Sequence, residues 1–234
     1  MEEYLISKIA EIIQGKSFIK KPHYIHHIFT DSRSAFTTEN GLFFAIKGER
    51  HNGHLYIDEL YKKGIRNFVV SEFHNFDTKY SEANFILVDN TIDALQKFAA
   101  FYRMQYNIPI IGITGSNGKT IVKDWMSQLL DKDKVIVKSP KSYNSQIGVP
   151  LSVLQLNQST QIGIFEAGIS LPGEMEKLQK IIQPKIGIFT NIGNAHQENF
   201  TSIKQKIQEK LVLFKDCSTI IYCKDHKEIQ QEIF

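Results

Sequence analysis

Short apolar runs alternate with amphipathic helical stretches from one end of the chain to the other. In the first part, three apolar runs predict strands: residues 41–46, 68–70 and 85–88. Apolar residues spaced three or four apart predict helices near residues 5–13, 55–63 and 92–102, with Gly15 placed to end the first. This alternation is typical of a small α/β domain, which we expect to occupy residues 1–107.

A second alternation begins at Ile108, and its apolar runs are almost continuous. The strands expected from it are residues 108–113, 135–137, 162–165, 186–189 and 220–222, with helices at 119–130, 173–182 and 202–214. On the helix at 119–130 the apolar side is expected to carry Val122, Trp125, Met126 and Leu129. Strands of this kind are buried on both faces, so residues 108–234 predict a partial doubly wound, mostly parallel-sheet domain. Its ligand should lie at the carboxyl edge of the strands.

Composition narrows the classes of partner. The chain has 234 residues, 42% hydrophobic, with a formal net charge of +3. Its basic residues are scattered, which argues against nucleic acid. No apolar run approaches a membrane-spanning length, and the acidic start at Met1–Tyr4 lacks a signal-peptide pattern. The two cysteines, Cys217 and Cys223, form no metal motif. We expect free thiols, no membrane insertion, a cytoplasmic location and a monomer.

A glycine-rich loop follows the strand at 108–113 and opens the next helix. Its residues are Gly112, Ile113, Thr114, Gly115, Ser116, Asn117, Gly118, Lys119 and Thr120. Strand, glycine loop and helix in this order predict an ATP phosphate site built from backbone N–H groups and the helix dipole. Lys119 would reach the terminal phosphates and the Thr120 hydroxyl would bind Mg²⁺. The strict Walker pattern has a glycine where Ile113 stands, so a glycine-rich turn with an incidental lysine is the alternative.

Further motifs follow in a fixed order. They are Asn144–Pro150 (NSQIGVP), Glu166–Gly168 (EAG), Pro172–Glu174 (PGE) and Thr190–His196 (TNIGNAH), with Asp31–Arg33 (DSR) and Gly41–Gly48 (GLFFAIKG) upstream. Together with the TGSNGKT loop, this set resembles the Mur ligases and the related folylpolyglutamate synthases. The resemblance covers nearly the whole chain. The segment at residues 43–54 is also similar to the version fused to an alanine racemase in some bacteria.

This resemblance implies an ATP-dependent carboxylate–amine ligase of peptidoglycan synthesis that works through an acyl phosphate. The NSQIGVP loop and the AG-x-x-x-PGE segment are most similar to the members that join D-alanyl-D-alanine to UDP-N-acetylmuramoyl-tripeptide. ATP and Mg²⁺ are the implied cofactors. Family members have further central strands and a closing domain, so we expect this chain to be the front part of a longer enzyme, unable by itself to complete turnover. Another Mur ligase, a folylpolyglutamate synthase and a non-catalytic nucleotide-binding module are the alternatives.

The resemblance also implies roles for three side chains that bear on magnesium. Glu166 follows an apolar strand and would face the nucleotide cation, although a solvated strand-end charge has the same pattern. His196 would bind a second magnesium, whereas a lone loop histidine is usually a surface residue. Lys210 borders the apolar stripe of its helix, where a lysine can also snorkel to water. In the family the matching lysine is carbamylated and bears on that second magnesium.

Substrate contacts are expected at both domains. Ser32 and Arg33 would bind the UDP end of the substrate, because arginine suits two-pronged phosphate contact. Asn52 is expected beside them, and Asn144 would lie in a substrate-side loop. Ile121 follows the GKT triplet where the family often has a second hydroxyl, which leaves Thr120 as the magnesium ligand of the loop.

Overall fold

The computed structural model describes residues 1–34, 40–48, 51–72, 76–193 and 197–233. The chain divides into two compact units, Met1–Phe98 and Ala99–Phe234. This division lies inside helix α4 (Thr91–Met104), whereas the sequence pattern places a boundary after Asn107. The sheets of the two units share no described strand. None of the helices in the described ranges combines the length and apolarity that a bilayer crossing requires.

The first unit is an α/β domain, in line with the sequence pattern. Its described strands are β1 (Tyr4–Leu5), β2 (Lys16–Phe18), β3 (Tyr24–Ile25), β4 (His27–Phe29), β5 (Gly41–Phe44), β6 (Asn67–Val70) and β7 (Asn84–Leu87). The helices are α1 (Ile6–Ile12), α2 (Ile57–Lys62), α3 (Phe76–Lys79) and α4, with short 3₁₀ turns η1 (Ser32–Ser34) and η2 (Gly53–Tyr56). The main sheet has the order β2-β7-β6-β5-β4, parallel except for the β2–β7 pair, and β1 pairs with β3.

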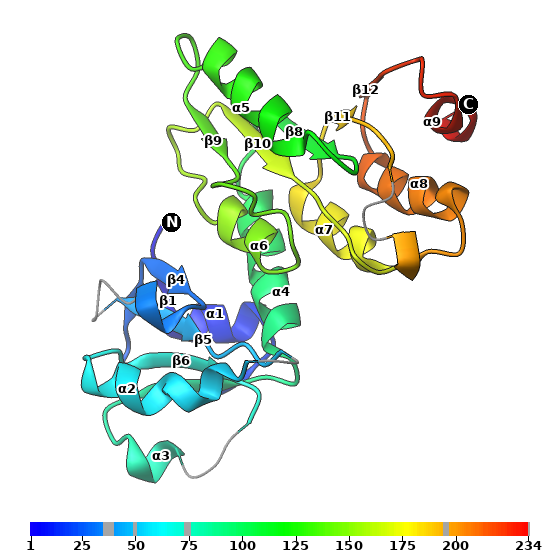
Figure 1. Cartoon of the computed structure of the whole chain (residues 1–234). Coiled ribbons are helices and arrows are strands. Elements are labelled where there is room, and N and C mark those ends of the chain that lie inside the picture. Colours follow the sequence, from blue (N-terminus) through cyan, green and yellow to red (C-terminus); the bar gives the residue numbers. More distant parts are fainter. Residues whose placement is uncertain (35–39, 49–50, 73–75, 194–196, 234) are drawn as a thin grey trace. The chain divides into compact units, whose positions relative to one another are not determined.

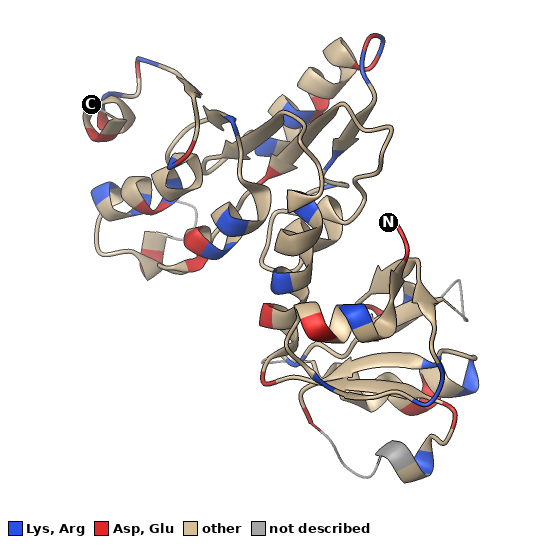
Figure 2. Cartoon of the chain, turned by 180° about the vertical axis from the view of Figure 1, so that it is seen from behind, with Lys and Arg blue, Asp and Glu red and all other residues tan. Residues whose placement is uncertain are grey.

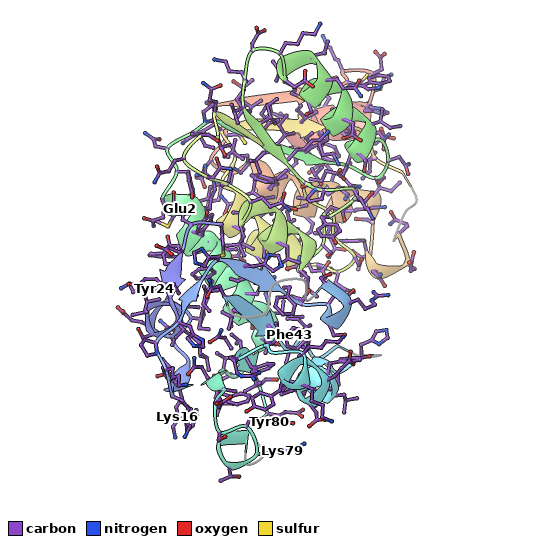
Figure 3. The ribbon with its side chains drawn as sticks, turned by 90° about the vertical axis from the view of Figure 1, so that its left-hand side faces the viewer. Glu2, Lys16, Tyr24, Phe43, Lys79 and Tyr80 are labelled. Atoms are coloured by element: carbon purple, nitrogen blue, oxygen red, sulfur yellow. The ribbon has the colours of Figure 1, made fainter. Side chains whose placement is uncertain are left out.

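Aromatic side chains fill the core of this unit. Phe43 on β5 and Phe68 on β6 are fully buried, and Phe68 stacks on Phe85 with ring centroids 5.2 Å apart. Figure 3 labels Phe43, together with Lys79 at the end of α3 and Tyr80 just after it. Tyr80 packs into the same core and the Lys79 ammonium lies 5.0 Å from its ring centroid. Every residue of β5 and β6 is buried, which explains why continuous apolar runs form the centre of this sheet.

The first helix ends differently from the sequence expectation. Gln14 adopts the left-handed conformation, with φ of 57°, and the Gly15 N–H then bonds to the Ala10 carbonyl. Gly15 is needed for space instead, because a Cβ there would lie 2.4 Å from Ile86 Cγ2. The glycine therefore marks the helix end through close packing and not through its own φ angle.

The second unit is a parallel-sheet domain. Its described strands are β8 (Ile110–Thr114), β9 (Ile136–Lys138), β10 (Ile162–Glu166), β11 (Ile186–Phe189) and β12 (Thr219–Tyr222). Its helices are α5 (Lys119–Leu130), α6 (Gly148–Val153), α7 (Glu174–Ile182), α8 (Ile203–Leu211) and α9 (Lys227–Ile233), with 3₁₀ turns η3 (Gln197–Asn199) and η4 (Val212–Phe214). The strand order is β12-β11-β8-β10-β9, and every neighbouring pair is parallel. The chain therefore leaves the central strand β8 in both directions, which creates a topological switch point beside β8.

Helices cover both faces of this sheet, which confirms the doubly wound prediction. On one face, Ile111, Ile113, Ile164 and Ile188 pack against Val122 and Met126 of α5. On the other face, η4 packs over the sheet and α7 packs against η4, while α6 contacts α7. Figure 1 shows α5 on one side of the strands and α6 and α7 on the other.

The apolar side of α5 is narrower than the sequence suggested. Trp125 and Leu129 are 65% and 78% exposed, while Lys123 and Ser127 turn inward and are buried. Helix α5 lies over β8, β9 and β10, and it turns Lys123 toward Glu166 at the end of β10. Figure 2 shows both signs of charge distributed over the helices of each unit.

Candidate functional site

The loop between β8 and α5 has the backbone of an anion cradle. Gly115 has φ of 139° and Gly118 has φ of 81°, conformations that L side chains rarely adopt. A Cβ at Gly115 would also lie 2.0 Å from Thr190 Oγ1. No side chain caps the start of α5 at Gly118. Glycine has no side chain to cap the first turn of α5, which leaves its N–H groups at the end where the helix dipole favours a phosphate.

The residues before Gly118 are bound to the loop that follows β11. The Ser116 N–H donates to the Asn191 carbonyl at 2.9 Å and the Asn117 N–H donates to Asn191 Oδ1 at 3.0 Å. Ser116 Oγ accepts from the Gly193 N–H at 2.9 Å. These bonds give Ser116 and Asn117 a structural role in joining two strand ends. Their expected contact with a nucleotide stays a prediction.

Two further residues of the expected cradle are explained by packing. Gly112 lies inside β8, and a Cβ there would be 2.9 Å from Pro184 Cβ. Thr114 is fully buried, and its hydroxyl donates to the Ala167 carbonyl at 2.9 Å. The structure therefore gives Gly112 and Thr114 roles in holding β8 against its neighbours, and their expected contact with a nucleotide stays a prediction.

Lys119 and Thr120 form the first turn of α5. The Lys119 ammonium donates to the Gly115 carbonyl at 2.8 Å, so the side chain folds back over the loop. Burial lowers the Lys119 pKa, and the nearby Glu166 carboxylate partly opposes that shift. Thr120 Oγ1 donates to Glu166 Oε2 at 3.1 Å and lies 3.3 Å from Ser142 Oγ. The GKT triplet and Glu166, the last residue of β10, therefore meet in space, as the sequence predicted.

Glu166 supplies a carboxylate at the carboxyl edge of the parallel sheet. It ends β10, it is fully buried, and its N–H donates to Ser139 Oγ at 3.1 Å. Its Oε2 accepts from Thr120 and lies 3.5 Å from Asn144 Nδ2, and its Oε1 lies 2.9 Å from the Lys123 ammonium. A carboxylate, a hydroxyl and an amide group in one place offer the oxygen ligands that Mg²⁺ prefers. The donor set thus fits a magnesium ion, with Glu166 and Thr120 as the residues that would hold it.

Lys210 lies on α8 with only 3% of its surface exposed. Burial, with a smaller contribution from the charges of Lys119 and Lys206, lowers its pKa to about 7. The snorkelling alternative is therefore wrong, because the side chain turns inward near Lys119 instead of reaching water.

Within the described ranges no group of three acidic, histidine or cysteine side chains is placed to hold a metal. His196 lies outside the described residues, so its role as a metal ligand stays a prediction.

The expected substrate residues of the first unit lie on two short 3₁₀ turns. Ser32 and Arg33 are in η1, where the guanidinium of Arg33 is 88% exposed and pairs with Asp31 at 2.6 Å. Hydrogen bonds from Arg33 lower the Asp31 pKa to about 2. Asn52 caps η2 by accepting from the His54 N–H at 3.0 Å. An exposed arginine suits an anionic ligand, and the UDP contact stays a prediction.

Three residues near this edge were not singled out from the sequence. Lys123 contacts Glu166, Asn191 binds the Ser116 and Asn117 amides, and the Lys206 ammonium donates to the Gly193 carbonyl. A helical signal existed for the lysines, because Lys123 stands four residues after Lys119 and Lys206 stands four before Lys210. Asn191 carried no signal beyond its place in a strand-end motif.

A separate hollow of about 980 Å³ lies at the amino end of the same sheet. Its lining includes Ile108, Pro109, Pro184 and Lys185, and it contains none of the site residues expected from the sequence. Parallel sheets bind ligands at the carboxyl edge, so the site is assigned to the region of Lys119 and Glu166.

Known proteins match the chain along almost its full length. The Mur ligase middle domain matches residues 113–233, and the Mur ligase family catalytic domain matches residues 24–103. The UDP-N-acetylmuramoyl-tripeptide–D-alanyl-D-alanine ligase of Bacillus subtilis (strain 168) is 32% identical over 96% of this chain and 50% of that protein. The enzyme of the same name from Borreliella burgdorferi is 36% identical over 73% of this chain and 38% of that protein. The chain spans about half the length of the Bacillus relative.

Solved structures match the fold as well. MurF from Acinetobacter baumannii superposes with a TM-score of 0.85 at 24% identity, covering 99% of this chain and 52% of that one. The MurF ligase from Thermotoga maritima in complex with ADP has a TM-score of 0.77 at 27% identity, covering 89% of this chain and 48% of that one. With matches to both the middle and the catalytic domain, this chain belongs to the Mur ligase family.

Proposed function

We propose that this chain supplies the UDP-substrate and nucleotide-binding parts of an ATP-dependent ligase that joins D-alanyl-D-alanine to UDP-N-acetylmuramoyl-tripeptide. One observation carries the proposal: the uncapped start of α5 and the buried carboxylate of Glu166 meet through Thr120 at 3.1 Å. An anion cradle beside a hard-oxygen cation site is what a magnesium nucleotide requires. The names of the relatives from Bacillus subtilis and Borreliella burgdorferi support the choice of substrates.

The substrate carboxylate is a poor electrophile and must be activated before an amine can attack it. A substrate carboxylate oxygen attacks the γ-phosphorus of ATP, ADP leaves, and an acyl phosphate forms. The amine of the incoming dipeptide then attacks the acyl carbon, loses a proton, and expels inorganic phosphate. Bound Mg²⁺ would neutralise the crowded phosphate oxygens.

The residues of this chain would share that work. Lys119, folded over the loop at 2.8 Å from the Gly115 carbonyl, is close enough to the cradle to swing toward terminal phosphates. Glu166 and Thr120 would hold the first cation, and His196 and Lys210 would bear on a second. Asn144, whose amide lies 3.5 Å from Glu166 Oε2, would contact the substrate beside the nucleotide.

We further propose that Lys210 is carbamylated in the working enzyme. Only a neutral amine adds carbon dioxide, and a pKa of about 7 makes roughly half of the Lys210 side chains neutral at pH 7, against roughly one in three thousand for an ordinary lysine. The product would be an anion facing Lys119 and Lys206 instead of a third cation. Carbon-13 NMR with labelled bicarbonate checks this. A carbamate signal should grow in the wild-type chain and be absent from Lys210→Met.

Nucleotide binding tests the core of the proposal. Calorimetric titration of the chain with ADP and Mg²⁺ should show binding that Lys119→Met weakens by about 1–3 kcal/mol, the scale of a charge-assisted hydrogen bond. Lys180→Met is the matched control, because Lys180 is an exposed lysine on α7 paired with Glu176. Equal affinities of all three proteins would contradict the assignment of the loop.

Substrate choice needs a separate measurement. UDP-N-acetylmuramoyl-tripeptide should bind the chain, and Arg33→Ala should weaken that binding without changing ADP affinity. A preference for UDP-N-acetylmuramic acid or its shorter peptides would favour another Mur ligase, and binding of ADP alone would favour a nucleotide-binding module.

A further inference from the structure

Among the described residues, the buried Lys123 has two partners in other segments, and its ammonium also lies 3.7 Å from Oδ1 of the adjacent Asp124. It stands one turn after Lys119 on α5 and is 1% exposed. Its ammonium lies 2.9 Å from Glu166 Oε1 and donates a hydrogen bond to the Lys141 carbonyl. The contact with Glu166 is an ion pair without hydrogen-bond geometry, since Oε1 has no hydrogen-bond partner among the described residues. Lys123 is therefore the charge that faces this oxygen.

The contact divides the Glu166 carboxylate into two unlike oxygens. Oε1 faces the Lys123 ammonium, and Oε2 faces the Thr120 hydroxyl in the first turn of α5. A buried carboxylate without a cation would be strongly disfavoured, and a freely rotating one would present either oxygen. The ion pair thus fixes which oxygen is left for a ligand.

The second partner belongs to the segment that leads to Asn144. Lys141 has φ of 47°, a left-handed conformation that is costly for a residue other than glycine. Such strain persists only where neighbouring contacts impose it, and the bond from Lys123 to the Lys141 carbonyl is such a contact. Three residues later, the Asn144 backbone carbonyl accepts a hydrogen bond from the Gly168 N–H at 2.8 Å. The segment is therefore held at both of these points against the edge of the site.

We propose that Lys123 is a positioning residue. It orients Glu166 Oε2 and holds the 141–144 segment so that both lie beside the nucleotide-bound cation. The inference rests on the proposed nucleotide function and adds to it a residue that contacts no phosphate itself. It follows from the two contacts together: one lysine fixes the cation ligand and the segment that carries Asn144. Lys123 would act on cation affinity through Glu166, in the way that residues behind metal ligands orient them.

The test compares ADP affinity in Mg²⁺ with ADP affinity in EDTA, using the whole chain. In Lys123→Met the gain in affinity from Mg²⁺ should fall about tenfold, the lower end of the effect of removing a residue behind a metal ligand. The affinity in EDTA should change less than about twofold, because the cradle N–H groups are untouched. Hydrogen exchange at residues 141–144 should speed up without nucleotide or metal, because Lys141 loses its anchor.

Two further variants separate positioning from general stability. Arg103→Met removes another buried cation, which donates to the Ile182 and Tyr106 carbonyls, and should leave the Mg²⁺ gain unchanged. Lys123→Arg keeps the charge and should retain part of the gain, which also serves if Lys123→Met does not fold. An unchanged Mg²⁺ gain in either folded Lys123 variant, or an equal loss in Arg103→Met, overturns the inference. A wild-type chain with no Mg²⁺ gain overturns the proposed nucleotide site, and the inference with it.

Discussion

The buried Lys210 should make the fold less stable at low pH than at high pH. Its pKa falls from 10.5 to about 7 in the folded chain because it is desolvated and faces Lys119 and Lys206. Between these two values the unfolded chain binds a proton that the folded chain does not. The free energy of unfolding therefore rises with pH across this window, and below about pH 7 the full penalty applies.

The size of the effect follows from the shift. Integrating the linkage between about pH 6 and pH 9 gives a change of about 2–3 kcal/mol from Lys210 alone. Lys210→Met removes both the charge and its titration, and methionine fits a buried position without a large change in volume. We therefore expect Lys210→Met to be more stable than wild type at about pH 6, with an advantage that shrinks by about 2–3 kcal/mol at about pH 9.

Urea unfolding in degassed, metal-free buffer measures this difference. The single tryptophan of the chain, Trp125, lies on α5 in the second unit, so its fluorescence reports on the unit that contains Lys210. Lys180→Met, at an exposed lysine of α7, controls for the general loss of a positive charge. If the stability difference between Lys210→Met and wild type is the same at both pH values, Lys210 is an ordinary solvated lysine. Lys210 would then not be the neutral amine that carbamylation requires.

Three other outcomes follow from the packing. Cys223 is exposed whereas burial raises the Cys217 pKa to about 11, so a thiol reagent at about pH 8 should label Cys223 first; equal rates in a mass-spectrometric time course would contradict this. Gly115→Ala should lower the free energy of unfolding by about 2 kcal/mol or more and weaken ADP binding, because its φ angle is unsuited to alanine. Asn84→Ala should cost about 2–4 kcal/mol in a circular-dichroism melt, because two backbone N–H groups lose the buried Oδ1 they share at 2.7 and 3.1 Å; a loss below about 0.5 kcal/mol would refute that role.

Stability and function pull in opposite directions at this edge of the sheet. Three lysines, Lys119, Lys206 and Lys210, gather beside the cradle, and burial lowers the pKa of each. Without an anionic ligand such a group is a cost to the fold, which nucleotide phosphates would offset. Sites of this kind are expected to break the ordinary rules of burial.

Much of the second unit was determined by the sequence. The helix at 119–130 has the bounds that were predicted, and the apolar runs at 162–165 and 186–189 form β10 and β11. Continuous Ile-rich runs are typical of strands in a sheet that is covered on both faces. Because strands in a parallel sheet end at one edge, the sequence also predicted that Glu166 and Thr120 lie at the same edge of the sheet.

Periodicity decided less about which face of a helix is buried. Trp125 and Leu129 fit the apolar side of α5 and yet are exposed, while Lys123 is buried. An apolar pattern records which side chains prefer burial, whereas the neighbouring strands decide which of them obtain it. Lys123 is buried because the Glu166 carboxylate and the Lys141 carbonyl meet its ammonium, and neither partner is near it in the sequence.

The sequence by itself thus determined the strands, the helices and the edge at which the chemistry gathers, because these depend on local spacing and on the geometry of parallel sheets. Only the tertiary structure decided that Asn191 binds the Ser116 and Asn117 amides and that Lys123 faces Glu166. It also decided that Lys210 turns inward instead of reaching water. These contacts join segments tens of residues apart, and their free energies depend on burial and on charges that come together only when the chain has folded.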